Sequence, residues 1–167
     1  MSQAPISEQI SYGYEPPRNT QFSVFLDMRV GKLLDLVQTF HGQHASLVGL
    51  SVVDATDHAV VRVLTSRADL ARRLLTRRNL PFSEAEVLAV ELSGGKTLPE
   101  LCRTLLGAEL NIHYAYPLLV QPRRLPVIAL HTDDLILSAQ LLRRKMFTLL
   151  AENDLGDNAT GGIEGEV

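Results

Sequence analysis

The sequence predicts an α+β protein built from two similar units, each with a small antiparallel sheet. Between residues 20 and 155, the apolar residues alternate between the spacing of a strand and the spacing of a helix. The order of these elements in the first half of the chain recurs in the second half. The halves also align by residue: Leu33 with Leu98, Thr39 with Thr104, Gly42 with Gly107, and, after a two-residue change in a turn, Leu74-Leu75 with Leu141-Leu142.

Each element of the first half follows from its local pattern. Residues 21–26 have the pattern of a strand, 31–40 of a helix, 46–53 and 59–64 of two strands joined by a polar turn, and 68–78 of a second helix. The first helix collects Leu33, Leu36, Val37 and Phe40 on one face, and the second collects Leu70, Leu74 and Leu75. Residues 87–92 form a further strand, which could close the first unit, open the second, or do both.

The second half repeats this order. Residues 98–110 are expected to be a helix, 111–120 and 126–131 two strands, 135–145 a helix, and 147–150 a closing strand. Strand–helix–strand–strand–helix–strand is the ferredoxin-like βαββαβ arrangement, so the predicted fold is two fused ferredoxin-like units with antiparallel sheets. We place an N-terminal arm at residues 1–19, unit 1 at 20–86, unit 2 at 87–155, and a flexible Gly- and acid-rich tail at 156–167.

Composition restricts the classes of protein that this chain can belong to. It has 167 residues, of which 46% are hydrophobic and 21% are charged, with a formal charge of −3, so a packed core is expected. No apolar run approaches the roughly 18 residues of a spanning helix, and the first residues lack the pattern of a signal peptide. A cytoplasmic protein without membrane contact is therefore expected.

No pattern in the sequence predicts catalysis, a cofactor or a metal site, so we expect a protein that is not an enzyme. His41 and His44 lack a carboxylate pair at metal-ligand spacing. Cys102 shares the apolar stripe of its predicted helix with four leucines and is expected to be an inert core thiol: Leu98, Leu101, Leu105 and Leu106. Asp133 is the expected N-cap of the last helix.

Two patterns bear on phosphate groups. Gly95-Lys96-Thr97 matches the end of a phosphate-binding P-loop, but the first glycine of that motif is replaced by Val90. Arginines cluster at 72–73 and 77–78, and basic residues at 143–145, where they could be exposed helix ends or a phosphate or nucleic-acid surface. Because the net charge is negative and no aromatic RNA-binding pattern is present, we expect no nucleic-acid partner.

Three segments of the chain resemble tandem ACT domain proteins. Residues 25–33 (FLDMRVGKL) are similar to the family's first strand and the turn that opens its first helix. Residues 107–112 (GAELNI) are similar to the entry into the second strand, and residues 112–116 (IHYAY) to that strand. Val30 replaces the proline of the family's turn, and residues 93–97 (SGGKT) have no Pro-Gly pair before their helix.

This resemblance implies a non-catalytic, allosteric regulatory or sensor protein that binds a small molecule, with an amino acid as the expected ligand. It also implies a homodimer and a partner enzyme on another chain. The implied ligand-binding residues are Asp27, Met28, Arg29, Val30 and Gly31 in unit 1, and Ser93, Gly94, Gly95, Lys96 and Asn111 in unit 2. The alternative is a protein-interaction or scaffold dimer that no longer binds a ligand.

Elementary helix chemistry is compatible with a ligand at the first of these loops. A strand that turns sharply into a helix directs free N–H groups and the positive end of the helix dipole outward, where they favour a carboxylate. Gly31 lets the backbone approach a ligand closely, Asp27 could pair with an ammonium group, and Arg29 with an acidic group. Asp27 and Gly31 could equally build only a tight turn and a helix cap. Asn111 could likewise contact a ligand or simply end a loop.

Overall fold

The structure is a computed structural model that describes residues 15–27 and 29–156. Its elements follow in the order β1 (Asn19–Asp27), α1 (Lys32–Phe40), β2 (Leu47–Asp54), β3 (His58–Thr65), α2 (Ala68–Arg77), β4 (Phe82–Glu91), α3 (Leu98–Leu106), β5 (Ile112–Pro117), β6 (Val127–Thr132), α4 (Leu135–Arg144), β7 (Thr148–Leu150) and the 3₁₀ helix η1 (Glu152–Leu155). Met28, most of the expected N-terminal arm and nearly all of the expected tail lie outside the described residues.

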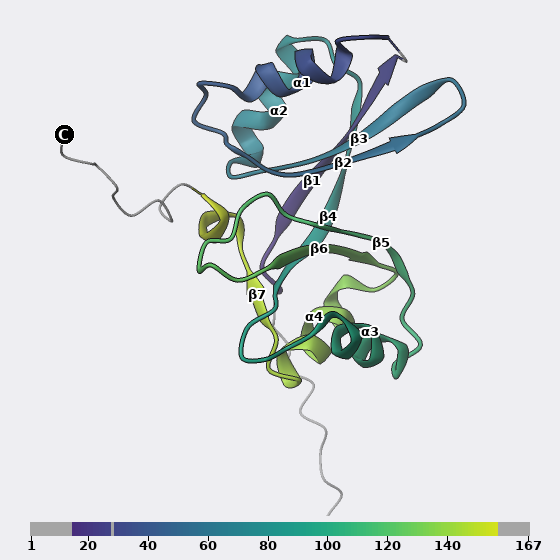
Figure 1. The fold of residues 1–167 in the computed structure, drawn as a ribbon, viewed down its shortest axis with the longest axis vertical. Helices are drawn as coiled ribbons and strands as arrows, with labels where there is room; N and C mark the ends of the chain where they lie inside the picture. The colour runs from purple at the N-terminus through teal and green to yellow at the C-terminus, as the bar shows by residue number, and fades with distance from the viewer. Residues whose placement is uncertain (1–14, 28, 157–167) are drawn as a thin grey trace, which may run out of the picture.

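The strands confirm the predicted fold class. Unit 1 has the strand order β2-β3-β1-β4 and unit 2 the order β5-β6-β4-β7, and every pairing is antiparallel. Both are the order of a ferredoxin-like unit. Helices α1 and α2 pack together in unit 1, and α3 and α4 in unit 2, at opposite ends of the molecule (Figure 1).

Strand β4 belongs to both units. Phe82–Val87 pairs with β1, whereas Leu88–Glu91 pairs with β6, and its last residues pair on the other edge with β7. Of the three roles that the sequence left open for this strand, the structure therefore selects the one in which it does both. Residues 82–86 were not expected in the strand because Ser83, Glu84 and Glu86 interrupt its apolar pattern. Their place in the strand comes from hydrogen bonding to β1, which local pattern does not reveal.

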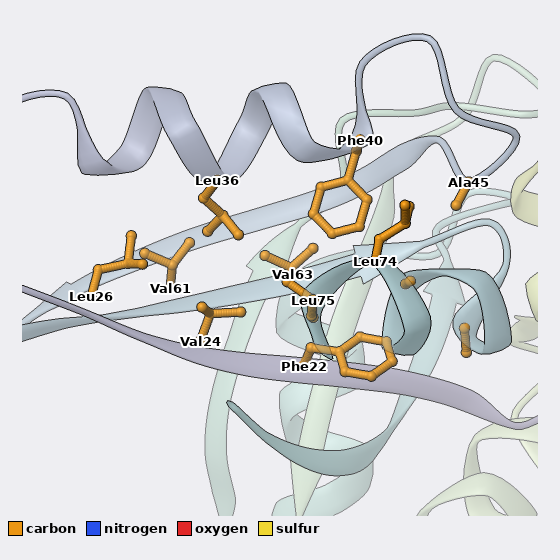
Figure 2. Packing of buried hydrophobic residues seen from close by; sticks show 12 residues of the cluster. Phe22, Val24, Leu26, Leu36, Phe40, Ala45, Val61, Val63, Leu74 and Leu75 are labelled. Carbon is orange, nitrogen blue, oxygen red and sulfur yellow. The ribbon is translucent and has the colours of Figure 1, made fainter. Parts of the chain in front are cut away.

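Each unit buries a core between its sheet and its helices. In unit 1, Phe22 and Val63 of the sheet meet Leu36, Phe40 and Leu75 of the two helices, and all five side chains are buried (Figure 2). In unit 2 the corresponding cluster is formed by Leu88, Val90, Leu101, Leu105, Leu130, Ala139, Leu142 and Phe147. The helical period of the sequence therefore identified Leu36 and Phe40 of α1 as packing residues, although Leu33 of the same predicted face is exposed.

A third cluster holds the two units against each other. Its buried members come from both halves of the chain: Val48, Leu64, Val87, Ala89, Val127, Leu150 and Leu155. At its edge, Gly49 of β2 forms a bridge with Leu118, and the Leu119 amide donates to the Val48 carbonyl at 2.8 Å. The units therefore form one continuous body.

The segment after β7 also joins the units. The carboxylate of Glu152 in η1 accepts a hydrogen bond from the Ala68 amide at 2.6 Å, which caps the N-terminus of α2. Leu155 inserts into the third cluster. No local pattern predicts η1, because a single turn of 3₁₀ helix has no periodicity of its own.

Helix α3 departs from two predictions. It ends at Leu106 rather than at residue 110, since Gly107 is its C-cap and Glu109 takes a positive φ of 57°. The prediction that Cys102 is a core thiol is wrong, because this cysteine is exposed. Only Leu101 and Leu105 of the apolar stripe are buried, while Leu98 and Leu106 are exposed. The stripe is therefore wider than the face that packs on the sheet.

Among the described residues, no helix combines the length and apolar character needed to cross a bilayer.

Close packing at Gly49 gives a test of the contact between the units. A Cβ at this position would lie 2.8 Å from Leu118 Cδ2 and 3.1 Å from Leu64 Cβ. We expect Gly49→Ala to lower the free energy of unfolding by about 1–3 kcal/mol, because the Leu118 side chain must move and β2 must shift slightly from Leu64 to admit a methyl group. Urea denaturation measures this change.

The matched control is Gly107→Ala, where φ is −62° and the nearest atom to the new Cβ is a carbonyl oxygen at 3.4 Å. Equal stability of the Gly49→Ala and Gly107→Ala proteins would contradict the close approach of the units.

Candidate functional site

The turn from β1 into α1 is built by its own backbone. The Arg29 amide donates to the Asp27 carbonyl at 2.7 Å, and the Lys32 amide donates to the Arg29 carbonyl at 3.3 Å. Gly31 precedes the helix with φ of 87°, a left-handed conformation that favours glycine. No neighbouring atom lies within 4 Å of the place of its missing Cβ. The backbone here is therefore open to solvent on its outer side.

A hollow of about 300 Å³ lies beside this turn. Three of the expected ligand residues, Asp27, Arg29 and Val30, line it together with Leu26, Lys32, Leu33, Val52, Ala59 and Val61. These additional residues are brought in by strand pairing, since Leu26 lies opposite Ala59 and Val52 lies opposite Val61. Its volume is at the lower end of the range for small-molecule sites.

The wall of the hollow is apolar and its rim is charged. Val30 is fully exposed, and Leu33, which the sequence placed on the apolar face of its helix, is 41% exposed at the rim. Asp27 supplies a carboxylate, while Arg29 and Lys32 supply cations. A site with both signs of charge beside an apolar wall is complementary to a zwitterion that carries an apolar side chain.

Helix α1 differs from the other helices at its first turn. Glu152 caps α2, Thr97 and Glu100 form a capping box on α3, and Asp134 caps α4. Among the described residues, no side chain caps α1. The Lys32 amide bonds to the Arg29 carbonyl, so the uncapped amides that could meet an anion at the turn are those of Leu33 and Leu34.

The corresponding loop of unit 2 is closed by its own groups. Ser93 shares a hydrogen bond with Thr148, and the Lys96 amide donates to the Ser93 carbonyl at 3.1 Å. Gly94 and Gly95 take positive φ angles of 62° and 78°. The Thr97 hydroxyl accepts from the Glu100 amide, so the helix N-terminus that would face a ligand is already capped.

Asn111 is engaged within the fold. Its side-chain amide donates to one oxygen of Asp133 at 2.9 Å, and its backbone amide donates to the other at the same distance. Asp133 therefore does not cap the last helix as predicted; Asp134 does, by accepting from the Leu137 amide. Asp133 and Asp134 are adjacent in the sequence, so local pattern does not distinguish them. Because Asp133 pairs with Asn111, Asp134 is the residue that caps the helix.

The structure does not bring all the expected residues of unit 2 together. Asn111 lies beside the end of β6 at which Ile112 pairs with Thr132, whereas the Ser93–Lys96 loop follows the end of β4 at which Glu91 pairs with Val127. These are opposite ends of β6. In unit 1, by contrast, Asp27, Arg29 and Val30 share one hollow.

Sequence reasoning missed six residues of the hollow in unit 1: Leu26, which directly precedes the expected loop, and Lys32, Leu33, Val52, Ala59 and Val61. Lys32 and Leu33 directly follow the expected loop and could have been included for that reason. Val52, Ala59 and Val61 depend on the register of β2, β3 and β1, for which the isolated sequence contains no signal.

Known structures share this fold. Protein BT0572 from Bacteroides thetaiotaomicron superposes with a TM-score of 0.71 and 20% sequence identity over 83% of this chain and 95% of its own. The regulatory subunit of aspartate kinase from Thermus thermophilus superposes with a TM-score of 0.51 and 7% identity over 78% of this chain and 93% of its own. The fold implied by the resemblance to tandem ACT proteins is therefore confirmed. No protein-family model and no curated protein matches the chain.

The pairing of Asn111 with Asp133 predicts a dependence of stability on pH. The hydrogen bond from the Asn111 side chain, followed by those of backbone amides and by the nearby His113, lowers the pKa of Asp133 below its ordinary value. Because the folded state favours the ionised carboxylate, the contribution to stability is fully present above the ordinary pKa of about 4. It is lost as the pH falls through the lower pKa of the folded state.

We expect Asn111→Ala to unfold at a lower urea concentration than the unmodified protein at pH 7, and the gap between the two to narrow toward pH 3. Gln38→Ala, which removes an exposed amide from α1, serves as the control and should show no such narrowing. A gap that stays constant over this pH range would contradict the pairing.

Proposed function

We propose that the chain is a non-catalytic regulatory protein that binds an amino acid in the hollow beside the β1–α1 turn. The observation that carries the proposal is the joint lining of this hollow by Asp27, Arg29 and Val30 at the uncapped N-terminus of α1. In this arrangement the ligand carboxylate meets Arg29 and the first turn of the helix, which no described side chain caps, and the ligand ammonium group meets Asp27. The side chain of the ligand lies against Val30, Leu33 and Val52.

Of the two loops that the resemblance implies as sites, we favour the loop of unit 1. The loop of unit 2 uses its helix N-terminus and its serine for internal hydrogen bonds. Binding an amino acid there would require these hydrogen bonds to break, which costs free energy. In the first loop, no side-chain hydrogen bond of this kind is present among the described residues. One amino-acid site per chain is therefore expected, and Asn111 is expected to support the fold.

Amino-acid binding can be tested by calorimetry or by thermal unfolding against each of the twenty amino acids. A ligand present at about 100 times its Kd should stabilise the protein by roughly 2.7 kcal/mol. We expect one chemical class of amino acid to raise the unfolding midpoint. Asp27→Ala and Gly31→Ala should each lower the affinity for that amino acid by about tenfold or more.

The control variant is Gly42→Ala at the other end of α1. Gly42 has φ of 71°, close to the 87° of Gly31, and neither glycine has an atom within 4 Å of the place of a Cβ. The two substitutions therefore impose similar backbone strain, and only the one at Gly31 should change affinity. No response to any amino acid, or equal losses for both glycines, would refute the site and favour the scaffold alternative.

We also propose that the protein acts as a homodimer through the edge of β2. The β1–α1 turn lies at the end of unit 1 away from unit 2, so unit 2 does not cover the hollow, and a second chain could (Figure 1). Beyond the bridge at Gly49, β2 pairs on one side with β3, and its other side has no strand among the described residues. Val52 and Val53, 51% and 38% exposed, lie on this strand. Exposed edges of this kind pair readily with another strand.

Sedimentation velocity tests the dimer. We expect the unmodified protein to sediment as a dimer and Val52→Lys to sediment as a monomer, because a charge on the strand must lose its hydration when the edge is covered. Leu106→Lys, on an exposed leucine of α3, should leave the dimer unchanged. A monomer at all concentrations, or dissociation by both substitutions alike, would contradict pairing through β2. The regulated partner on another chain and a cytoplasmic location stay predictions from the sequence.

A further inference from the structure

A second hollow, of about 240 Å³, lies in unit 2 on the side of its helices. Six residues line it: Lys96, Glu100, Arg103, Thr104, Lys145 and Phe147. The three cations among them come from separate segments of the chain, since Lys96 lies in the β4–α3 loop, Arg103 in α3, and Lys145 directly after α4. The fold of unit 2 therefore gathers positive charge around one depression.

The negative charge at this hollow is smaller than the positive charge. Glu100 is the one carboxylate in the lining, and its Oε1 lies 3.9 Å from Lys96 Nζ. Its Oε2 accepts a hydrogen bond from the Thr97 amide at 3.1 Å. Within the described part of the chain, Arg103 and Lys145 form no ion pair. Because the whole chain has a formal charge of −3, this excess of cations is local.

One of the cations in the hollow, Lys96, lies against the aromatic ring of Phe147. Phe147 is only 4% exposed, and Lys96 Nζ lies 5.4 Å from the centre of its ring. The Lys96 side chain is 24% exposed, so its ammonium group is partly shielded from water. A cation against an aromatic face and away from bulk solvent interacts more strongly with an incoming anion than one on an open surface.

Unit 1 provides an internal comparison, because its turn after α2 has the same backbone hydrogen bond as the turn after α4 in unit 2, while two of the three cations have no counterpart in unit 1. The turn after α2 and the turn after α4 both contain a residue with positive φ, Asn79 at 53° and Met146 at 64°. Each is followed by the same backbone hydrogen bond, from Leu80 to Leu75 at 3.1 Å and from Phe147 to Leu142 at 2.9 Å.

In the alignment of the two halves, Lys96 and Arg103 take the places of Gly31 and Gln38, while Lys145 takes the place of Arg78. The fold of a unit therefore does not require cations at positions 96 and 103. Three like charges around one depression repel one another, and a bound anion relieves that repulsion. The excess positive charge at this hollow therefore favours the binding of an anion.

We propose that this hollow is a binding site for a small polyanion, a ligand with two or more negative charges carried by phosphate or carboxylate groups. Arg103 presents a planar guanidinium that can donate two parallel hydrogen bonds to such a group, and Lys96 and Lys145 approach it from the other two segments. This site is separate from the hollow of unit 1 and does not depend on the amino-acid site proposed there.

The test is isothermal titration calorimetry of the full chain with two probes, inorganic pyrophosphate and citrate, at constant ionic strength. We expect saturable binding of at least one probe. Arg103→Gln, which introduces the residue that unit 1 has at the aligned position, should weaken binding by about tenfold or more. Lys145→Gln should weaken it in the same direction. Binding of pyrophosphate alone identifies a phosphate site, and binding of citrate alone a polycarboxylate site.

The matched control is Arg144→Gln, which removes an exposed charge next to Lys145 but outside the lining of the hollow. It should change the affinity by less than about twofold, since exposed charges at a distance are screened by salt. Circular dichroism confirms that each variant is folded. The proposal is overturned if neither probe shows saturable binding, or if Arg144→Gln weakens binding as much as Arg103→Gln does.

Discussion

The sharing of β4 by two sheets is the constraint on which the rest of the structure depends. A single run of backbone hydrogen bonds passes from β1 to β6 and β7 within ten residues, so neither unit can move away without breaking the ladder of the other. Ferredoxin-like units this small have marginal cores. Sharing the strand creates a third buried cluster that neither could form alone. Glu91 ends this strand as a fully buried carboxylate, held by two hydrogen bonds from Arg123 at 3.0 and 2.6 Å, which also raise the pKa of the guanidinium.

The two units have the same topology but use the turn before their first helix differently. In unit 1 the N-cap residue is Gly31, which has no side chain to accept from the helix amides, while in unit 2 the N-cap residue is Thr97, whose hydroxyl accepts from the Glu100 amide. A side chain at one position thus decides whether a helix end is available to a ligand or satisfied internally. In the sequence alignment of the two halves, the second hollow has Lys96 and Arg103 where unit 1 has Gly31 and Gln38. A duplicated fold can therefore carry two chemically different sites.

Sequence periodicity was sufficient to predict the order of helices and strands along the chain and the repeat of that order, because those features depend on local spacing. Periodicity did not predict the features that depend on tertiary contacts. The first half of β4 is stabilised by pairing with β1 in spite of its glutamates, and Cys102 is exposed because the sheet covers only part of the apolar stripe on α3. The loop residues Asp27, Arg29 and Val30 were predictable from their position before a helix. Val52 and Ala59, which complete the hollow, depend on strand register, and that register is fixed only by the assembled sheet.

The placement of β1 indicates how a ligand at unit 1 could be sensed. At one end β1 supplies Asp27 to the hollow. At the other, Gln21 is buried between the hydroxyls of Tyr114 and Tyr116 at 2.8 and 2.7 Å, and the same burial raises the pKa of Tyr116. A strand anchored at this end, and paired with β3 and β4 along its length, resists sliding or rotation. An internal hinge between the units is therefore disfavoured. The groups left to respond to the proposed ligand are at the surface of unit 1, where the turn, α1 and the edge of β2 meet, so the proposed signal would be passed on most directly as a change in association.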